Sequence, residues 1–266
     1  MAKKHDLEKR RMDLMQRHVV ELAREDFSKR YPGVQLGKTV ALIAAYEEEE
    51  NIADVLHAMP KEACGMPVTT LVVVDGGDDR TAEIVIEEGV YALIFPVNLG
   101  HGVALRAGYN LCIDLEVEFI VTLDADGQND PTEIPVMLQP LVDDESDFVV
   151  GSRRLGVDNT SDLFRKAGVV FFSAVVNVLT RSKLTDTSNG YRALRIAMLK
   201  DVVPRCVQVQ YQTSELIITA IRRGWRISEK PTVWYPRAHG TTKKGNSLLY
   251  GFRYANVVFR TWWRER

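Results

Sequence analysis

Short runs of apolar, often β-branched residues alternate with helix-spaced segments through the middle of the chain. The apolar runs occupy residues 39–45, 68–74, 91–95, 118–123 and 147–150. The helix-spaced segments between them occupy residues 49–59, 81–88, 102–115 and 132–142. Continuously apolar strands that alternate with helices are typical of a parallel sheet whose strands are buried on both faces. The pattern therefore predicts an α/β fold with a mostly parallel, Rossmann-like sheet flanked by helices.

Helical patterns also lie on either side of this α/β region. Residues 4–30 have apolar side chains at helical spacing among many charged ones, and Tyr31-Pro32-Gly33 ends the pattern. The last segment, 248–266, interleaves aromatic and basic side chains. We therefore divide the chain into an N-terminal amphipathic helical extension (1–38), an α/β domain (39–244) and a basic aromatic C-terminal helix (245–266).

Two further apolar stretches, 169–179 and 248–263, contain polar or charged residues and fall short of the roughly 20 apolar residues that a spanning helix needs. The charged N-terminus lacks the apolar core of a secretory signal. Three scattered cysteines predict neither a zinc site nor a disulfide framework. We therefore expect a cytoplasmic protein, and peripheral attachment to the inner face of a membrane remains open.

The formal net charge of −2 conceals a strong asymmetry along the chain. Residues 1–38 carry +4 and residues 222–266 carry +9, whereas residues 39–221 carry −15. The acidic middle argues against nucleic acid as a partner, although aromatic and basic tails can bind single strands. The asymmetry instead suggests a metal site in the acidic region and anion binding by the basic tail.

The clearest candidate chemistry follows the fourth apolar run, at Asp124-Ala125-Asp126-Gly127-Gln128. Residues i and i+2 at the end of a strand point to the same side, so two carboxylates are held close together. Two such charges raise each other's pKa unless a cation lies between them. Mg²⁺ and Mn²⁺ favour one or two carboxylates together with phosphate oxygens. We therefore expect Asp124, Asp126 and Gln128 to bind Mg²⁺ or Mn²⁺, with a solvated turn as the alternative.

Polar residues and glycines follow the other strands as well. Asp75, after the second strand, can accept hydrogen bonds from a base or a ribose. Gly100 and Gly102 open a helix, which permits an anion to approach its free N–H groups. A turn cap and an ordinary helix start are the structural alternatives. Ligands of parallel sheets bind beyond the carboxyl ends of the strands, so we expect these segments to converge.

Together these segments resemble family 2 glycosyltransferases with the GT-A fold, and within them the dolichol-phosphate mannose synthase-like (polyprenyl-phosphate glycosyltransferase) group. The matching segments occur in the family's order, at residues 44–52, 74–78, 98–104, 124–131, 151–153, 186–192, 229–231 and 237–243. Ala44 and Glu47 stand where the family has Pro and Asn, and His101 stands where Lys or Arg is usual. One acid, Asp75, remains of the family's usual pair. The long N-terminal helix lies outside the resemblance.

The resemblance implies an inverting transfer of a sugar from a UDP- or GDP-sugar. It implies that the donor is bound by Ala45, Tyr46, Glu48, Asp75, Asn98, Gly100, Gly102, Asp124, Ala125, Asp126, Arg237 and Lys243. Arg237 and Lys243 would lie on a loop that closes over the donor phosphates. Arg153, Arg165 and Arg192 would face the acceptor, and with Asp126 and Glu215 they form the candidate catalytic set.

The acceptor decides whether a base is needed. A phosphate acceptor is already an anion at neutral pH and needs cationic residues to bring it in, for which arginine is well suited. A hydroxyl acceptor needs a carboxylate base within hydrogen-bond reach, and Asp126 and Glu215 are the candidates. A polyprenyl phosphate is favoured by the resemblance, and a soluble hydroxyl compound stays as the alternative.

Two further functions stay open at this point. A sugar-phosphate nucleotidyltransferase shares the scaffold and the metal, but it carries a Gly-rich basic run after the first strand, where this chain has Tyr46–Glu50. A non-catalytic nucleotide-sugar binding protein would explain the departures from the family pattern, but Asp124 and Asp126 argue for turnover. Segment 169–179 fits a core helix or a helix that contacts the acceptor or a membrane. Segment 248–266 fits a membrane-surface helix, packing on the domain or a subunit interface, and the N-terminal helix also fits pairing of copies.

Overall fold

The computed structural model describes residues 2–160, 163–210, 212–240 and 247–266, and the side chains of 10–160, 166–210, 212–240 and 254–266. The described part of the chain forms an eight-stranded sheet with the strand order β2-β3-β1-β5-β7-β6-β8, and β4 pairs with β3. The strands are β1 (Thr39–Ala45), β2 (Glu62–Ala63), β3 (Met66–Val74), β4 (Tyr91–Ile94), β5 (Phe119–Asp124), β6 (Phe148–Asp158), β7 (Arg192–Arg195) and β8 (Ile227–Trp234).

The sheet is mostly parallel, as predicted. Strands β4, β3, β1 and β5 pair in parallel, and β6 pairs in parallel with β8. The exceptions are the two-residue β2 and the short β7, which lies antiparallel between β5 and β6. Because β7 has only four residues and an arginine at each end, its sequence carries no apolar run that would have predicted it.

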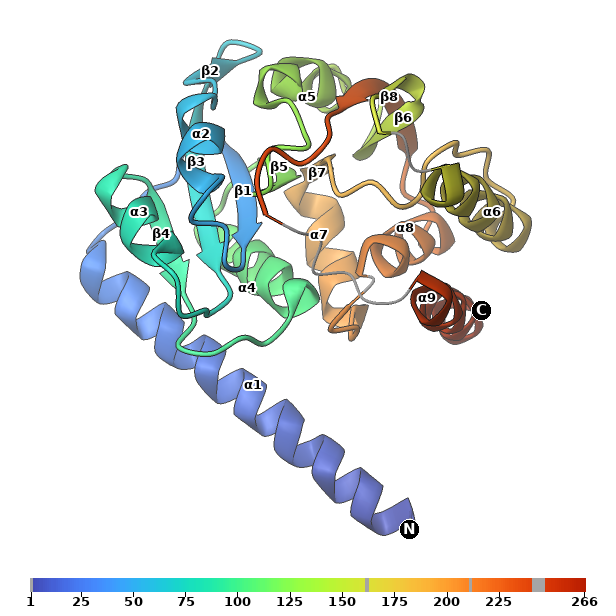
Figure 1. Ribbon diagram of the computed structural model, residues 1–266, viewed down its shortest axis with the longest axis horizontal. Helices are drawn as coiled ribbons and strands as arrows, with labels where there is room; N and C mark the ends of the chain where they lie inside the picture. Colours follow the sequence, from blue (N-terminus) through green and yellow to red (C-terminus); the bar gives the residue numbers. More distant parts are fainter. Residues whose placement is uncertain (1, 161–162, 211, 241–246) are drawn as a thin grey trace.

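Helices cover both faces of the sheet (Figure 1). They are α1 (Ala2–Arg30), α2 (Ile52–His57), α3 (Thr81–Glu87), α4 (His101–Asp114), α5 (Ile134–Val142), α6 (Leu163–Thr180), α7 (Ile196–Val202), α8 (Gln212–Arg222) and α9 (Ser247–Arg264). Short 3₁₀ turns, η1 (Pro131–Glu133) and η2 (Val203–Arg205), precede α5 and follow α7.

The core has two halves because successive side chains of a strand point to opposite faces. All seven residues of β1 are buried. Val40 and Leu42 belong to the cluster that α1, α4, α7 and α8 cover. Ala41 and Ile43 belong to the cluster that α2, α3 and α5 cover. Burial on both faces is the reason that β1 is continuously apolar in the sequence.

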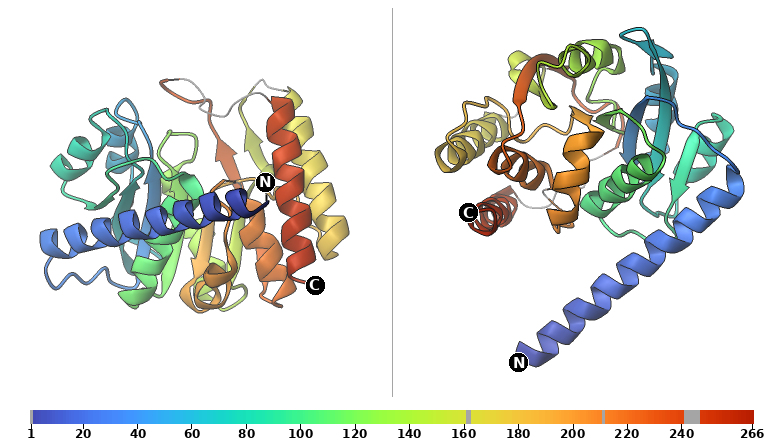
Figure 2. Two further views of the ribbon diagram at one scale, coloured as in Figure 1. Left: turned by 90° about the horizontal axis from the view of Figure 1, so that it is seen from below. Right: turned by 180° about the vertical axis from the view of Figure 1, so that it is seen from behind.

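The two terminal helices differ in how they attach. The C-terminal half of α1 packs on β4 and α4 through Val19, Ala23 and Phe27, while its N-terminal half projects away from the sheet (Figures 1 and 2). Helix α9 packs against α6 and α8, so these helices form the end of the molecule opposite α3 (Figure 1). Among the described residues, no helix combines the length and the hydropathy needed to cross a membrane.

Candidate active site

Loops from three strands meet at the guanidinium of Arg237, which lies just beyond β8. Its Nη1 donates to both carboxylate oxygens of Glu48, at 3.0 and 3.1 Å, and its Nη2 donates to Oδ2 of Asp126 at 3.0 Å. Glu48 follows β1 and Asp126 follows β5, and both carboxylates are nearly buried. The convergence expected at the carboxyl edge of the sheet is therefore present, with an arginine at its centre.

The segment that carries Arg237 is fastened at both ends. On one side, Tyr235 and Gln128 exchange hydrogen bonds: the backbone N–H of Tyr235 donates to the Gln128 carbonyl at 2.9 Å, and Gln128 Nε2 donates to the Tyr235 carbonyl at 3.0 Å. On the other, the His239 N–H donates to Asn51 Oδ1 at 3.2 Å. The side chain of Gln128 thus holds this segment against the acidic loop as well as lying beside Asp126.

The two aspartates after β5 differ in their surroundings. Asp126 pairs with Arg237, and its Oδ1 accepts a hydrogen bond from the Gln128 N–H at 3.1 Å. Asp124 is half-buried. Among the described residues, none donates a hydrogen bond to its carboxylate and none forms an ion pair with it. A Cβ added at Gly190 would lie only 3.1 and 3.2 Å from the two oxygens of Asp124. The absence of a side chain at Gly190 therefore leaves room for this carboxylate.

The donor set suits a hard divalent cation. Asp124 and Asp126 offer carboxylate oxygens, and Gln128 offers an amide oxygen, since its nitrogen already donates to Tyr235. Among the described residues there is no group of three or more His, Cys, Asp or Glu side chains placed to hold a metal ion. The protein can thus supply one or two carboxylates, and the other ligands would be waters and substrate oxygens, which is the arrangement that Mg²⁺ accepts.

Asp75 directly follows β3, and its carboxylate is buried against the backbone of another loop of the protein. Its two oxygens accept hydrogen bonds from the backbone N–H groups of Leu99, at 2.7 Å, and Gly100, at 2.9 Å. Burial raises the pKa of Asp75 to about 6, although these two hydrogen bonds act in the opposite direction. The carboxylate thus holds the loop after β4, and its contact with a nucleoside stays a prediction.

The helix start at Gly100 and Gly102 is in contact with another loop of the chain. The Gly102 N–H donates to the Val209 carbonyl at 2.8 Å, and a Cβ at Gly102 would lie 2.6 Å from the Gln208 carbonyl. The sequence predicts that an anion binds these N–H groups. In the structure the backbone of residues 208–209 lies against Gly102 instead. Asn98, just before them, is exposed.

The predicted donor residues after β1 and β5 lie at this same edge. Ala45, the last residue of β1, and Ala125 are buried, and Tyr46 is half-buried. Hydrogen bonding to Glu47 and partial burial raise the pKa of Tyr46 above its ordinary value. Lys243 lies outside the described residues. Arg165 falls in α6, but its side chain is outside the described set.

Arg153, predicted to face the acceptor, is engaged within the protein. It is buried and forms a two-pronged ion pair with Asp186, with Nε–Oδ2 at 2.6 Å and Nη2–Oδ1 at 2.8 Å. Its guanidinium also lies 4.7 Å from the ring centroid of Trp234. Glu229 accepts hydrogen bonds from the Thr185 and Asp186 N–H groups, at 2.8 and 2.9 Å. This arrangement fixes the loop before β7 rather than presenting a free cation.

Arg192 is buried as well. Its Nε donates to the Asn189 carbonyl at 2.9 Å and its Nη1 to the Thr213 carbonyl at 3.0 Å. Burial lowers its pKa to about 10. Its remaining nitrogen, Nη2, is buried without a hydrogen-bond partner among the described residues. Arg192 therefore supports the Asn189–Gly190 turn next to Asp124, and its guanidinium is buried and not exposed to an acceptor.

Glu215, the candidate base, is fully buried in α8. Its oxygens accept hydrogen bonds from the Val207 N–H at 3.0 and 3.1 Å and from the Gln208 N–H at 2.9 Å. Arg264 of α9 pairs with it at 3.0 Å. A carboxylate held in this way supports the loop that packs on Gly102, and its role as a base stays a prediction.

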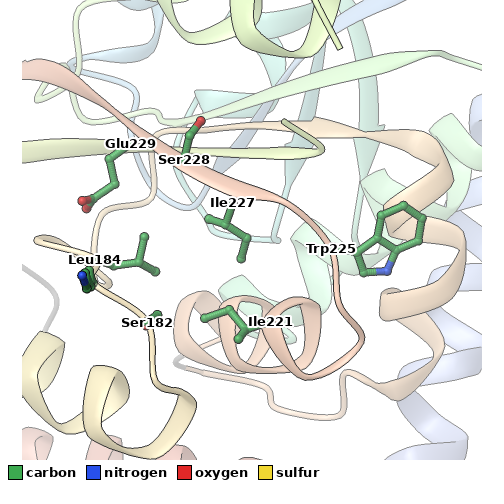
Figure 3. Close-up of a pocket in the computed structure, with 8 residues that line it drawn as sticks. Ser182, Leu184, Ile221, Trp225, Ile227, Ser228 and Glu229 are labelled. Carbon is green, nitrogen blue, oxygen red and sulfur yellow. The ribbon is translucent and has the colours of Figure 1, made fainter. Parts of the chain in front are cut away.

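A hollow of about 360 Å³ lies away from the cluster of Arg237, Glu48 and Asp126 (Figure 3). It is lined by residues after α6, at the end of α8 and at the start of β8, among them Leu184, Ile221 and Ile227. Arg237 follows the end of β8, so the hollow and the acidic cluster lie at opposite ends of that strand. The hollow is therefore separate from the candidate active site.

Comparison with known proteins identifies the family to which this chain belongs. The family model described as glycosyl transferase family 2 matches residues 40–203, which is more than half of the chain. The chain belongs to glycosyl transferase family 2. It is therefore a glycosyltransferase, which leaves the nucleotidyltransferase and the non-catalytic binding protein without support.

The relatives of this family 2 glycosyltransferase include lipid-phosphate transferases. It is 32% identical over 202 residues to a dolichyl-phosphate hexose transferase from Haloferax volcanii, covering 76% of this chain and 84% of the relative. It is 28% identical over 239 residues to UDP-N-acetylglucosamine–dolichyl-phosphate N-acetylglucosaminyltransferase from Methanococcus voltae, covering 80% and 91%.

Solved structures confirm the GT-A fold of this family 2 enzyme. Glucosyl-3-phosphoglycerate synthase from Mycobacterium tuberculosis, in complex with Mn²⁺, UDP-glucose and phosphoglyceric acid, superposes with a TM-score of 0.67. The identity is 18%, and the match covers 87% of this chain and 85% of that one. At this identity the likeness establishes the fold, with a mostly parallel sheet and flanking helices.

Some residues that shape the site carry no assigned role in the sequence interpretation. Glu229 and Gly190 belong to the segments that resemble the family, and that resemblance is the signal by which they can be found. Asn129 belongs to such a segment as well, within 124–131, whereas Tyr235 has no such signal. The Asp124 N–H donates to Asn129 Oδ1 at 3.3 Å, and Tyr235 pairs with Gln128 across more than 100 residues of chain. Only the tertiary structure places Tyr235 at the site.

Proposed function

We propose that this family 2 glycosyltransferase transfers a sugar, with inversion, from a nucleoside diphosphate sugar to a polyprenyl phosphate. The observation that carries the proposal is the cluster of Asp124, Asp126 and Arg237 at the carboxyl edge of the sheet. Two carboxylates suit a divalent cation, and an arginine suits the diphosphate. The dolichyl-phosphate transferases among the relatives support the acceptor class.

Asp124 and Asp126 would hold Mg²⁺ or Mn²⁺ together with the donor diphosphate, with the amide oxygen of Gln128 beside them. The cation would neutralise the charge that develops on the nucleoside diphosphate as the bond to the sugar breaks. Structural neighbours crystallised with Mn²⁺ or Mg²⁺ and UDP support this use of a metal.

Arg237 would change partners during binding. It now pairs with Glu48 and Asp126, and a diphosphate at this edge offers it stronger, two-pronged contacts. Once turned to the diphosphate, Arg237 would stabilise the leaving group where its charge grows, and Asp126 would be released toward the metal. Lys243 follows on the same segment and is retained as a second cation of the proposed clamp.

The engagement of Glu215 supports a phosphate acceptor over a hydroxyl acceptor. A hydroxyl needs a base, but Glu215 is buried and accepts three backbone hydrogen bonds and an ion pair. A phosphate is already ionised and attacks the anomeric carbon without proton removal. Arg165 is retained as the arginine proposed to bring the acceptor in, since Arg153 and Arg192 are engaged within the protein.

A donor panel tests the proposal. UDP- and GDP-sugars would be incubated with Mn²⁺ or Mg²⁺, with and without a detergent-dispersed polyprenyl phosphate, and nucleoside diphosphate release would be measured. We expect release that needs both the metal and the lipid phosphate and that is lost in Asp126→Ala. Transfer to a soluble hydroxyl compound in the absence of lipid phosphate would instead establish the alternative acceptor class.

A further inference from the structure

Helix α1 carries exposed apolar side chains, and its N-terminal half stands clear of the domain (Figures 1 and 2). Met12, Leu14, Met15 and Leu22 are each between 44% and 65% exposed. A group of apolar side chains with this exposure is unusual on a helix that has no partner, and it indicates a docking surface.

Five exposed residues form a row along α1 that is symmetric about its middle residue. The row consists of Arg11, Leu14, His18, Leu22 and Glu25, with spacings of three, four, four and three. At 3.6 residues per turn these positions lie within about 60° of arc, on one side of the helix. The buried residues of α1 that pack on the domain lie about 140° away from them. The row therefore faces away from the domain.

The two ends of the row carry opposite charges. Residues 10–17 contain three arginines and one aspartate, whereas residues 18–26 contain three acids and one arginine. Among the described residues, neither Arg11 nor Glu25 has an ion-pair partner, although the neighbouring Arg24 and Asp26 have one each. A helix with this distribution attracts an antiparallel copy of itself, because each basic end then lies beside an acidic one.

We infer that α1 pairs with α1 of a second copy of the chain, antiparallel, about a two-fold axis at His18. In this register Leu14 packs on Leu22 of the partner subunit, and Arg11 forms an ion pair with Glu25 of the partner subunit. The two-fold axis makes each of these contacts occur twice. The two domains lie at opposite ends of the helix pair, because each is attached to the C-terminal half of its own α1.

The charges disfavour other occupants of this face. A nucleic acid or an anionic lipid surface would meet the exposed carboxylates of Glu21, Glu25 and Asp26 along the second half of the row. A parallel pair of α1 helices would place Arg11 beside Arg11 of the partner subunit and Glu25 beside Glu25 of the partner subunit, and both contacts are repulsive. The antiparallel pair has neither conflict.

Sedimentation velocity of the full chain over a range of concentrations tests the inference without donor or acceptor. We expect the wild type to be a dimer. The double variant Leu14→Asp, Leu22→Asp should be a monomer, because carboxylates would replace the apolar contacts. Arg11→Glu and Glu25→Arg, made singly, should each raise the dissociation constant of the dimer by about tenfold or more, because each places two pairs of like charges across the interface.

Combining the two charge reversals distinguishes the antiparallel pair from other dimers. Arg11→Glu together with Glu25→Arg in one chain should restore the dimer. The two single variants, mixed, should form heterodimers that an affinity tag on one of them captures. The matched control is Asp13→Arg, which reverses an exposed acid on the opposite side of α1 and should dimerise like the wild type. A monomeric wild type, a single reversal that dimerises normally, or a combined variant that stays monomeric would overturn the inference.

Discussion

Arg237 Nη2 lies 3.0 Å from Asp126 Oδ2, so a guanidinium pairs with one of the two carboxylates that are proposed to hold the metal. Both side chains are largely buried, and Arg237 also pairs with Glu48. Under the proposed function, this arginine would compete with the metal for Asp126 in the absence of donor and would bind the diphosphate in its presence.

Arg237→Ala should reduce kcat by about a hundredfold to a thousandfold, because one preorganised partner of the leaving group is removed. The same change should tighten Mn²⁺ binding to the donor-free enzyme, since Asp126 loses its competing cation. Steady-state kinetics and calorimetric Mn²⁺ titration measure the two effects. Arg237→Lys keeps a charge without the two-pronged geometry and should fall between. Unchanged kcat in the alanine variant would refute the proposed role.

Gly190→Ala should weaken Mn²⁺ binding by about tenfold or more, because its Cβ would press on both oxygens of Asp124. The control is Gly168→Ala in α6, where the nearest contact of an added Cβ is 4.0 Å away. That change should leave metal binding intact and slightly stabilise the helix. Equal Mn²⁺ affinities for the two variants would show that Asp124 does not depend on the space at Gly190.

Asp186→Asn should destabilise the protein by about 3 kcal/mol, because it leaves the buried Arg153 guanidinium without its counter-charge. Urea denaturation measures the free energy of unfolding. Asp26→Asn removes an exposed ion pair with Arg30 and should cost well under about 1 kcal/mol. Adding Arg153→Met to Asp186→Asn should recover part of the loss. A loss equal to that of the surface control would contradict this account.

Asp75 should make stability fall as pH rises from about 4 to about 6. Its pKa in the folded protein is raised to about 6 from an ordinary value of 3.8, so the folded state retains the proton longer than the unfolded state. The stabilisation is complete below the lower value and is lost as pH passes the higher one. Unfolding free energies across this window, compared with those of Asp75→Asn, isolate the effect. A steeper fall in the variant would reverse the assignment.

Glu215→Gln separates a structural role from a base. Loss of the pair with Arg264 and of charged hydrogen bonds to the 207–208 loop should cost about 2 kcal/mol of stability. The shape of the pH profile of kcat should stay that of the wild type. If Glu215 were the base, its removal would abolish one limb of that profile while leaving stability nearly unchanged.

The order of strands and helices in the N-terminal half follows from local patterning. The run 39–45 forms β1 with the predicted bounds, since a strand buried on both faces must be apolar throughout. The antiparallel β7 is different, because its four residues are held by neighbours on both sides and need little apolar surface of their own. The segment 49–59 begins its helix only at Ile52, since the preceding residues turn to place Glu48.

What the sequence by itself determined is which residues stand at the ends of strands, because alternation and spacing are local properties. It placed Asp124 and Asp126 on one turn in this way. Only the tertiary structure decided which charged groups pair. Arg237 forms an ion pair with Asp126, and Arg153 forms one with Asp186. A charged side chain pairs with the opposite charge that the fold brings within reach. The sequence pattern of two loops that are far apart in the chain does not indicate that they will be in contact.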